Sequence, residues 1–287
     1  MFRNKNLSKG FLIKSLLAIV IAMKFFRYSQ DRLPVFFIVL LFLIDLSVFF
    51  SIDNIWLVAL WTSISLVPKA CICSWNHHHQ HVPTFYHVFP NRMLELIYAL
   101  QTGITTNAWV LHHVLGHHVN YLDQSKDESG WRRKDGKLMG AFEYTLTIAL
   151  TGYTRAYRVG KLHSKHQKTF VSMGIVSSIV LAALFLINWR NALLIFFAPM
   201  FIGYILTCWH TYYHHAGLDS KEPTEASYNI MHKWYNILTG NLGYHTAHHM
   251  KMGLHWSKLP EYHNQIADQI PKDLYREPSI PFKWLPG

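Results

Sequence analysis

Four long apolar stretches constrain this fold more than any other feature of the sequence. They occupy residues 33–50, 55–73, 169–187 and 192–209. A helix needs roughly 17 to 25 predominantly apolar residues to cross a bilayer, and each stretch has that length. Only residues 51–54 separate the first two stretches, and only residues 188–191 separate the last two. We therefore expect an all-α membrane protein in which four spans form two transmembrane helical hairpins.

The composition agrees with a chain that lies partly in lipid. Apolar residues make up 51% of the 287 residues and charged residues only 15%, where about 25% is typical of soluble domains. The three cysteines include no CxxC pair, and they are too few for a disulfide framework or for an iron–sulfur cluster with four cysteine ligands.

The distribution of positive charge predicts how the chain is oriented. Residues 74–168 carry 11 lysines and arginines, whereas the two short turns carry only Arg190. Because cytoplasmic loops are enriched in lysine and arginine, we expect residues 74–168 and 210–287 in the cytoplasm and both turns outside. This topology accounts for the formal net charge of +11 without a nucleic-acid partner.

Histidines are unusually numerous and are grouped. Fourteen of the 20 fall in four clusters, which contain the sequences HHHQH from residue 77, HHVLGHH from residue 112, HTYYHH from residue 210 and HTAHH from residue 245. His77 and His81 are four residues apart, as are His113 and His117, and residues at this spacing share one face of an α-helix. All four clusters lie in the segments predicted to be cytoplasmic, so we expect a helical cap on that side that carries them.

So many imidazoles on one side of a membrane predict a metal site. Neutral imidazole is a good ligand for iron, zinc, copper or nickel. Eight or nine such ligands are too many for one ion. Four or five per ion, with a coordination position left open, suit a dinuclear site that binds dioxygen. Two zinc ions also remain possible on ligand number alone.

We call the four histidine clusters of the sequence, which start at residues 77, 112, 210 and 245, the first to fourth histidine boxes. With these boxes around two predicted membrane hairpins, roughly residues 33–265 resemble the integral-membrane fatty acid desaturase and hydroxylase superfamily. Residues 241–263 (NLGYHTAHHMKMGLHWSKLPEYH) resemble its last histidine box and the HWxxLPxxH segment that follows. Residues 116–118 and 212–218 also look like the alkane-monooxygenase branch. His112 and His214, however, stand where that branch has glutamates, and Thr211 stands where it has asparagine.

The resemblance implies a non-haem di-iron centre with two Fe²⁺ ions and O₂ as co-substrate. The implied ligands are His77, His81, His113, His117, His118, His215, His245, His248 and His249. His214 competes with His215 for one position. An alignment to acyl-CoA desaturases would instead match His210 and His214 to an Asn-xxx-His pair of that family.

The activity implied by this resemblance is O₂-dependent oxidation of unactivated C–H bonds in a fatty acyl chain, and we expect desaturation first. Hydroxylation of a fatty acid or alkane and oxidative decarboxylation to a terminal alkene are alternatives. A histidine-rich metal transporter is the alternative from another class, but the predicted spans contain only two ionisable side chains, Asp45 and Lys69, and transport usually needs more.

The chain divides into three expected parts. Residues 1–32 form an interfacial segment, because residues 11–26 are apolar but short and are interrupted by Lys14 and Lys24. Residues 33–265 form the catalytic domain, and residues 266–287 form a tail of short helices and turns. Residues 121–140 have the composition of a loop.

The expected site needs an electron donor, a substrate tunnel and acceptors that orient its ligands. Electrons would come from a separate ferredoxin or rubredoxin-type donor with its reductase, and Arg132, Arg133 and Lys134 are one candidate docking patch. Candidate walls of a substrate tunnel are Trp56, Trp61, Trp109 and Phe196. Candidate acceptors that orient the ligands are Asn107, Asp123, Asp219, Glu225, Asn229 and Asn241.

Overall fold

The computed structural model describes residues 25–286, and within them every regular element is helical. This confirms the predicted all-α class. The elements that build the site are α2 (Arg32–Ser51), α3 (Ile55–His81), α4 (Val88–Thr102), η2 (Val110–His118), α5 (Ala141–Gly160), α6 (Ser164–Asn191), η3 (Ala192–Phe197), α7 (Ala198–His215), α8 (Lys233–Thr239), α9 (His245–Met250) and α10 (Leu259–Ile266). The interfacial helix predicted within residues 11–26 falls outside the described residues, apart from its last two.

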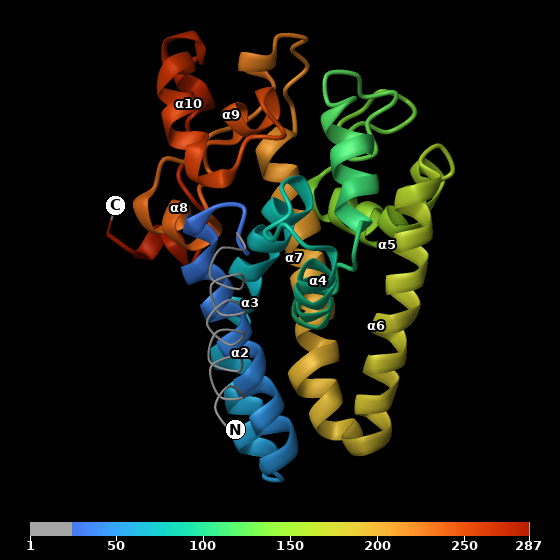
Figure 1. Ribbon diagram of the computed structural model, residues 1–287. Helices are drawn as coiled ribbons and strands as arrows, with labels where there is room; N and C mark the ends of the chain where they lie inside the picture. The colour runs from blue at the N-terminus through green and yellow to red at the C-terminus, as the bar shows by residue number, and fades with distance from the viewer. Residues whose placement is uncertain (1–24, 287) are drawn as a thin grey trace, which may run out of the picture.

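Among the described residues, three helical runs are long and apolar enough to cross a membrane. They are Ser29–Ser51, Ile55–His81 and Ser164–His215, the last with 52 residues. The third run reverses direction at Asn188, whose φ of −152° and ψ of 91° are not helical. Figure 1 shows α6 descending to this point and α7 climbing back. All four predicted apolar stretches are therefore helical, although a single non-helical residue replaces the expected second turn.

Side-chain amides close both reversals of the chain. Asn54 accepts hydrogen bonds from the backbone N–H groups of Trp56 (3.0 Å) and Leu57 (3.4 Å), and so caps the start of α3. The Asn191 side chain donates to the carbonyls of Phe49 (3.0 Å) and Ile52 (2.9 Å). Since these carbonyls lie at the end of α2, the bonds tie one reversal to the other.

A buried ion pair joins α2, α3 and η3 among the long helices. Lys69 lies 3.0 Å from Asp45, and both side chains are almost fully buried. The Lys69 ammonium also donates to the carbonyl of Ile195 at 2.8 Å, and the Trp61 indole donates to Asp45 at 2.9 Å. The two charged side chains of the predicted spans, Asp45 and Lys69, therefore neutralise each other.

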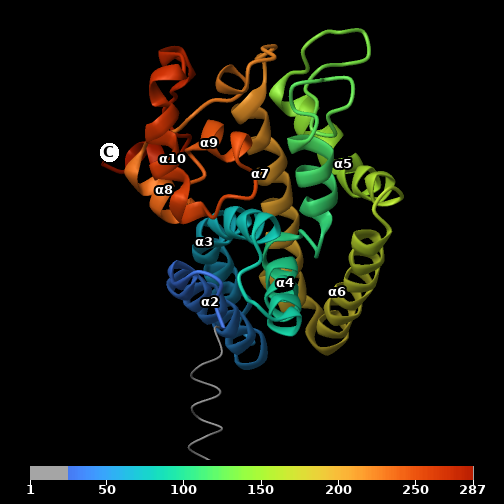
Figure 2. The same cartoon turned by 45° about the horizontal axis from the view of Figure 1, so that its top comes forward.

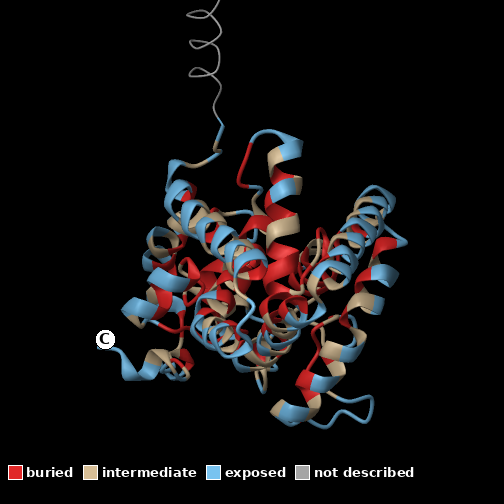
Figure 3. Cartoon of the chain, turned by 90° about the horizontal axis from the view of Figure 1, so that it is seen from below, coloured by how far each residue is buried: buried red, intermediate tan, exposed pale blue. Residues whose placement is uncertain are grey.

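Large apolar side chains on α2 and α6 point outward. Phe36, Leu43, Ile179 and Leu186 are all exposed, and the view along the long helices in Figure 3 shows buried residues gathered between them. Exposed apolar surface of this extent marks a contact with another apolar phase. Helices α2 and α6 thus have the outer surface that a bilayer requires.

The opposite half of the molecule carries the shorter helices. Helix α4 packs against α3, α6 and α7, and Figure 2 shows α8, α9 and α10 gathered beyond the end of α3. Helices α4 and α5 were not predicted individually. Residues 121–140 contain no helix, as expected.

Residues after 265 share a hydrophobic core with the helices before them. Ile266 and Leu274 pack in one cluster with Ala247 and Leu259. The backbone of Asn229 also donates to the Leu274 carbonyl at 2.7 Å. The boundary at residue 265 remains a prediction.

The buried ion pair generates a stability prediction. Asp45→Asn leaves the Lys69 ammonium buried without a counter-ion, which is expected to cost about 3 to 5 kcal/mol. The variant should therefore unfold at a clearly lower temperature in detergent than the parent protein. The matched control is Asp53→Asn, because Asp53 is exposed in the turn before α3. Equal unfolding temperatures for the two variants would contradict this role of the pair.

Candidate metal centre

Five histidines converge in a first cluster: His77, His81, His113, His118 and His248. The Nε2 atoms of His77 and His248 lie 2.9 Å apart. The Nε2 atom of His118 lies 2.9 Å from that of His113 and 3.1 Å from that of His248. Four of the five, all but His118, offer nitrogen atoms within 4.8 Å of one another.

A second cluster lies beside the first and contains four histidines: His117, His215, His245 and His249. His215 Nε2 lies 3.3 Å from His117 Nε2 and 3.0 Å from His245 Nε2. His249 Nε2 lies 3.2 Å from His245 Nε2. The rings of His118 and His249 stack with centroids 4.0 Å apart, so the two clusters are in direct contact.

Helix geometry distributes the box residues between the two clusters. His77 and His81 share one face of α3, as predicted from their spacing. The second box does not follow the predicted α-helical face, because η2 is a π-helix. A π-helix is held by i to i+5 hydrogen bonds, so its turns are wider than those of an α-helix. His113 therefore meets His118 in the first cluster, while His117 turns into the second.

Backbone and carboxylate acceptors orient several rings through Nδ1. His117 Nδ1 lies 2.8 Å from the buried carboxylate of Asp127. His215 Nδ1 lies 2.9 Å from the carbonyl of Ala226, and His81 Nδ1 lies 2.8 Å from the carbonyl of Met252. An Nδ1–H donor in these bonds leaves the lone pair on Nε2, which faces the clusters.

Asp127 replaces the acceptors that we predicted. Within the described residues, none of the six candidates hydrogen-bonds to a clustered imidazole through its side chain. Asp123 pairs with Lys126, Asp219 with Arg132, and Glu225 accepts from Ser220. Asn107 donates to the carbonyl of His166, and Asn241 to that of Trp256. No residue spacing marks Asp127 in the sequence, because it reaches His117 through an irregular loop.

Asn229, the remaining candidate, supports the site from further away. Its side chain donates to the hydroxyl of Thr246 at 2.8 Å and accepts from the backbone N–H of Thr246 at 3.1 Å. Thr246 follows His245 directly, so these bonds hold the start of α9. Gly243 is needed just before it, because a Cβ atom there would lie 1.9 Å from the carbonyl oxygen of Ile230.

The segment after the last box is held to the start of α2. His255 Nε2 and the Trp256 indole lie 3.0 Å and 2.7 Å from one Asp31 carboxylate oxygen. Tyr28 stacks on His255 with ring centroids 3.8 Å apart. The HWxxLP segment recognised in the sequence therefore anchors the chain after α9 to the start of α2.

The donor set fits metal ions. Burial lowers the pKa values of His113, His118 and His248 well below the ordinary histidine value, and neighbouring imidazoles lower them further. A neutral imidazole has only one N–H donor, so the inner nitrogens cannot satisfy one another throughout both clusters. His81 Nε2 is buried without a hydrogen-bond partner. One ion in each cluster would satisfy these lone pairs.

The remaining histidines of the boxes point elsewhere. His78 Nε2 lies 3.1 Å from the carbonyl of Thr239, and His79 lies between Thr84 and Glu95. His214 is outside both groups, because its Nε2 faces the hydroxyl of Tyr235 at 3.4 Å. His210 Nε2 lies 2.7 Å from the same hydroxyl. The structure thus brings His215, rather than His210 or His214, to the second cluster.

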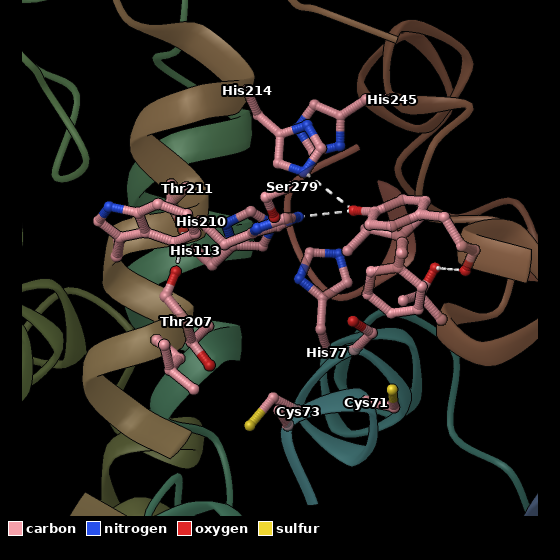
Figure 4. Close-up of a pocket in the computed structure, with 18 of the residues that line it drawn as sticks. Cys71, Cys73, His77, His113, Thr207, His210, Thr211, His214, His245 and Ser279 are labelled. Carbon is pink, nitrogen blue, oxygen red and sulfur yellow. Dashed lines mark hydrogen bonds between the residues drawn. The ribbon is translucent and has the colours of Figure 1, made fainter. Parts of the chain in front are cut away.

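A cavity of about 240 Å³ reaches both clusters (Figure 4). Its lining includes His77 and His113 of the first cluster and His215 and His245 of the second. Leu66 and Ala70 of α3 and Leu206 of α7 make it apolar on the side of the long helices. Residues 279–282 of the C-terminal tail cover another side.

Only one of the four predicted wall aromatics lines this cavity. Trp109 does so, whereas Trp56 is 77% exposed and Trp61 hydrogen-bonds to Asp45. Phe196 packs with Phe49 at the far end of the long helices. Aromatic residue type alone could not separate these environments.

The predicted docking patch is partly neutralised. Arg132 pairs with Asp219, and its Nε donates to Oδ1 of this carboxylate at 3.0 Å. Arg133 Nε donates to Glu143 at 2.6 Å. The patch therefore carries less free positive charge than its sequence suggests.

Comparison with known proteins adds a family match. The sequence model of the family described as Fatty acid desaturase matches residues 13–279, nearly the whole chain. No curated protein and no solved structure matches the chain.

The carboxylate behind His117 generates a prediction about metal retention. Asp127→Asn removes the acceptor charge that orients this imidazole, and such changes typically lower metal affinity 10- to 100-fold. Competition with a chelator, followed by metal analysis, measures the effect. Asp123→Asn is the control, because Asp123 lies on the surface of the same loop. Equal metal retention in both variants would contradict an orienting role for Asp127.

Proposed function

The chain belongs to the fatty acid desaturase family, and we propose that it is a membrane-bound, O₂-dependent di-iron oxidase acting on a fatty acyl chain, most simply a desaturase. The observation that carries this proposal is the convergence of nine histidines into two adjacent clusters beside an apolar cavity. Family membership alone supports an oxidoreductase with a fatty acyl substrate in a membrane. The clusters extend this to a specific cofactor arrangement.

We assign one Fe²⁺ ion to each cluster. The first ion would be held by His77, His81, His113, His118 and His248, and the second by His117, His215, His245 and His249. His214, which the sequence left as a competitor, is excluded from this proposed ligand set because its Nε2 faces Tyr235.

Bound iron would supply the reaction with O₂ and the removal of hydrogen from an unactivated C–H bond. The protein supplies geometry around that chemistry. Asp127 and the Ala226 carbonyl fix the rings of His117 and His215. Leu66, Ala70 and Leu206 form apolar walls that accept an alkyl chain and exclude water.

The alternatives share this site. Hydroxylation of a fatty acid or alkane and decarboxylation to a terminal alkene begin with removal of a hydrogen, as desaturation does. A metal transporter would need ionisable groups free to bind ions within the spans. The pairing of Asp45 with Lys69 argues against that class. Electrons would come from a separate ferredoxin or rubredoxin-type donor and its reductase.

We further propose four spans, formed by α2, α3, α6 and the run of η3 and α7, with the histidine clusters in a cytoplasmic cap. The apolar outer faces of α2 and α6 and the reversal at Asn188 support the number of spans. The concentration of lysine and arginine in residues 74–168 supports the orientation.

Metal analysis tests the cofactor proposal. Protein purified in mild detergent from iron-supplemented cells should contain about two irons per chain, one for each proposed site. His248→Ala and His215→Ala, one from each cluster, should each lower the iron content and abolish turnover. His163→Ala should do neither, because His163 lies outside both clusters at the start of α6. Zinc alone, even with iron in excess and oxygen excluded, would overturn the di-iron assignment.

Product analysis then separates the reactions. Iron-loaded protein supplied with a reducing system and a defined fatty acyl substrate should yield an unsaturated product of unchanged chain length. A hydroxylated product alone would replace the desaturase proposal with a hydroxylase. A terminal alkene one carbon shorter would replace it with a decarboxylase.

Cysteine labelling tests the orientation. In intact cells, Asp53→Cys in the first turn should react with a membrane-impermeant thiol reagent, because this turn is proposed to face outward. Lys134→Cys in the loop of the cap should react only after the membrane is opened. The native cysteines give a low background, since Cys73 and Cys208 are buried and Cys71 is half-buried. The reverse pattern would place the clusters outside.

A further inference from the structure

One corner of the cavity is polar although its neighbouring walls are apolar. The hydroxyl of Tyr235 lies 2.7 Å from His210 Nε2 and 3.4 Å from His214 Nε2. All three side chains line the cavity. Figure 4 shows His210 and His214 from α7 meeting this hydroxyl, with Ser279 of the C-terminal tail beside them.

Buried polar atoms without a hydrogen-bond partner line the same cavity. They are both ring nitrogens of His112 and the indole nitrogen of Trp109. Each of these residues lines the cavity and is less than a tenth exposed. A buried polar group without a hydrogen bond costs free energy, so a ligand with polar atoms bound in this cavity would relieve that cost.

We propose that Tyr235, supported by His210, binds an oxygen acceptor at the end of the substrate chain: the carboxylate of a free fatty acid or the carbonyl of an acyl ester. The inference rests on the proposed function, since it concerns the substrate of the same cavity. It adds a recognition site for the polar end, separate from the proposed metal ligands.

The geometry makes the tyrosine hydroxyl a donor toward the cavity. When His210 and His214 both donate Nε2–H to the tyrosine oxygen, the hydroxyl hydrogen is free for a ligand. Burial raises the pKa of Tyr235 well above its ordinary value, so the hydroxyl keeps this hydrogen. Phe282 of the tail packs edge-on against the Tyr235 ring, with centroids 5.2 Å apart, and holds the ring in place.

The location also orients the chain. The His214 ring stacks on that of His245 with centroids 3.9 Å apart, so the polar corner lies one ring away from the second cluster. The apolar walls of Leu66, Ala70 and Leu206 extend toward the long helices. A substrate bound in this way places its first carbons nearest the second cluster and its tail along Leu66, Ala70 and Leu206.

Equilibrium binding tests the proposal without requiring turnover. Purified full-length protein is titrated with radiolabelled dodecanoic acid, its methyl ester and dodecane, which share a chain length but differ in their ends. Tyr235→Phe removes one hydroxyl and keeps the ring. Tyr213→Phe is the matched control, because Tyr213 lies on α7 but is 41% exposed. Thermal unfolding of each variant checks that it is folded.

We expect Tyr235→Phe to weaken binding of the acid, the ester or both about tenfold, with dodecane binding and the Tyr213→Phe control unchanged. Loss for the acid alone identifies a free fatty acid as the source of the acceptor, and loss for the ester alone identifies an acyl ester. Unchanged binding of both, or equal weakening of all three ligands, would overturn the proposal.

Iron content of the same preparations distinguishes a failure of the recognition site from a failure of the di-iron function. A parent protein that holds two irons but whose Tyr235→Phe variant binds every ligand normally overturns the recognition site alone. A parent protein without iron that still distinguishes acid from alkane through Tyr235 overturns the di-iron function alone.

Discussion

The structure depends on holding many neutral imidazoles together out of water. A buried imidazole that lacks a partner destabilises the fold, and here nine of them face inward in two groups. Outer partners make this arrangement possible. Asp127 and the Ala226 and Met252 carbonyls bind Nδ1 of three rings, so their Nε2 lone pairs face the clusters. The irregular loops that provide these acceptors are therefore as important to the site as the helices that provide the ligands.

The long helices α3 and α7 determine where these clusters lie. Helices α3 and α7 both end in box residues, at His81 and His215, so the relative depth of the two helices determines whether His77 and His215 can approach α9. The Asp45–Lys69 pair and its bond to the Ile195 carbonyl hold α2, α3 and η3 together. A shift of η3 would move α7 along its axis and carry His215 with it.

Regular periodicity made part of this structure predictable. The apolar runs and the i, i+4 spacing of His77 and His81 indicated a helix that continues into the first box, and α3 is that helix. The π-helix of the second box could not be predicted, because residue spacing does not reveal i to i+5 hydrogen bonding. It becomes evident only in the structure, where His113 contacts His118. Asp127 was missed for a related reason, since a contact across ten residues of loop leaves no period in the sequence. The choice between His214 and His215 depended on the packing of Tyr235, which lies 20 residues further along the chain.

The different environments of His214 and His215 explain why the third box contains adjacent histidines. Successive residues on an α-helix point about 100° apart, so neighbouring side chains at the end of α7 cannot enter the same cluster. His215 turns toward His117 and His245, while His214 turns toward Tyr235 and the cavity. One helix end thus provides both a proposed metal ligand and a wall of the proposed substrate site. Because both residues lie at the end of α7, a shift of this helix would move His215 in the second cluster and His214 beside Tyr235 together.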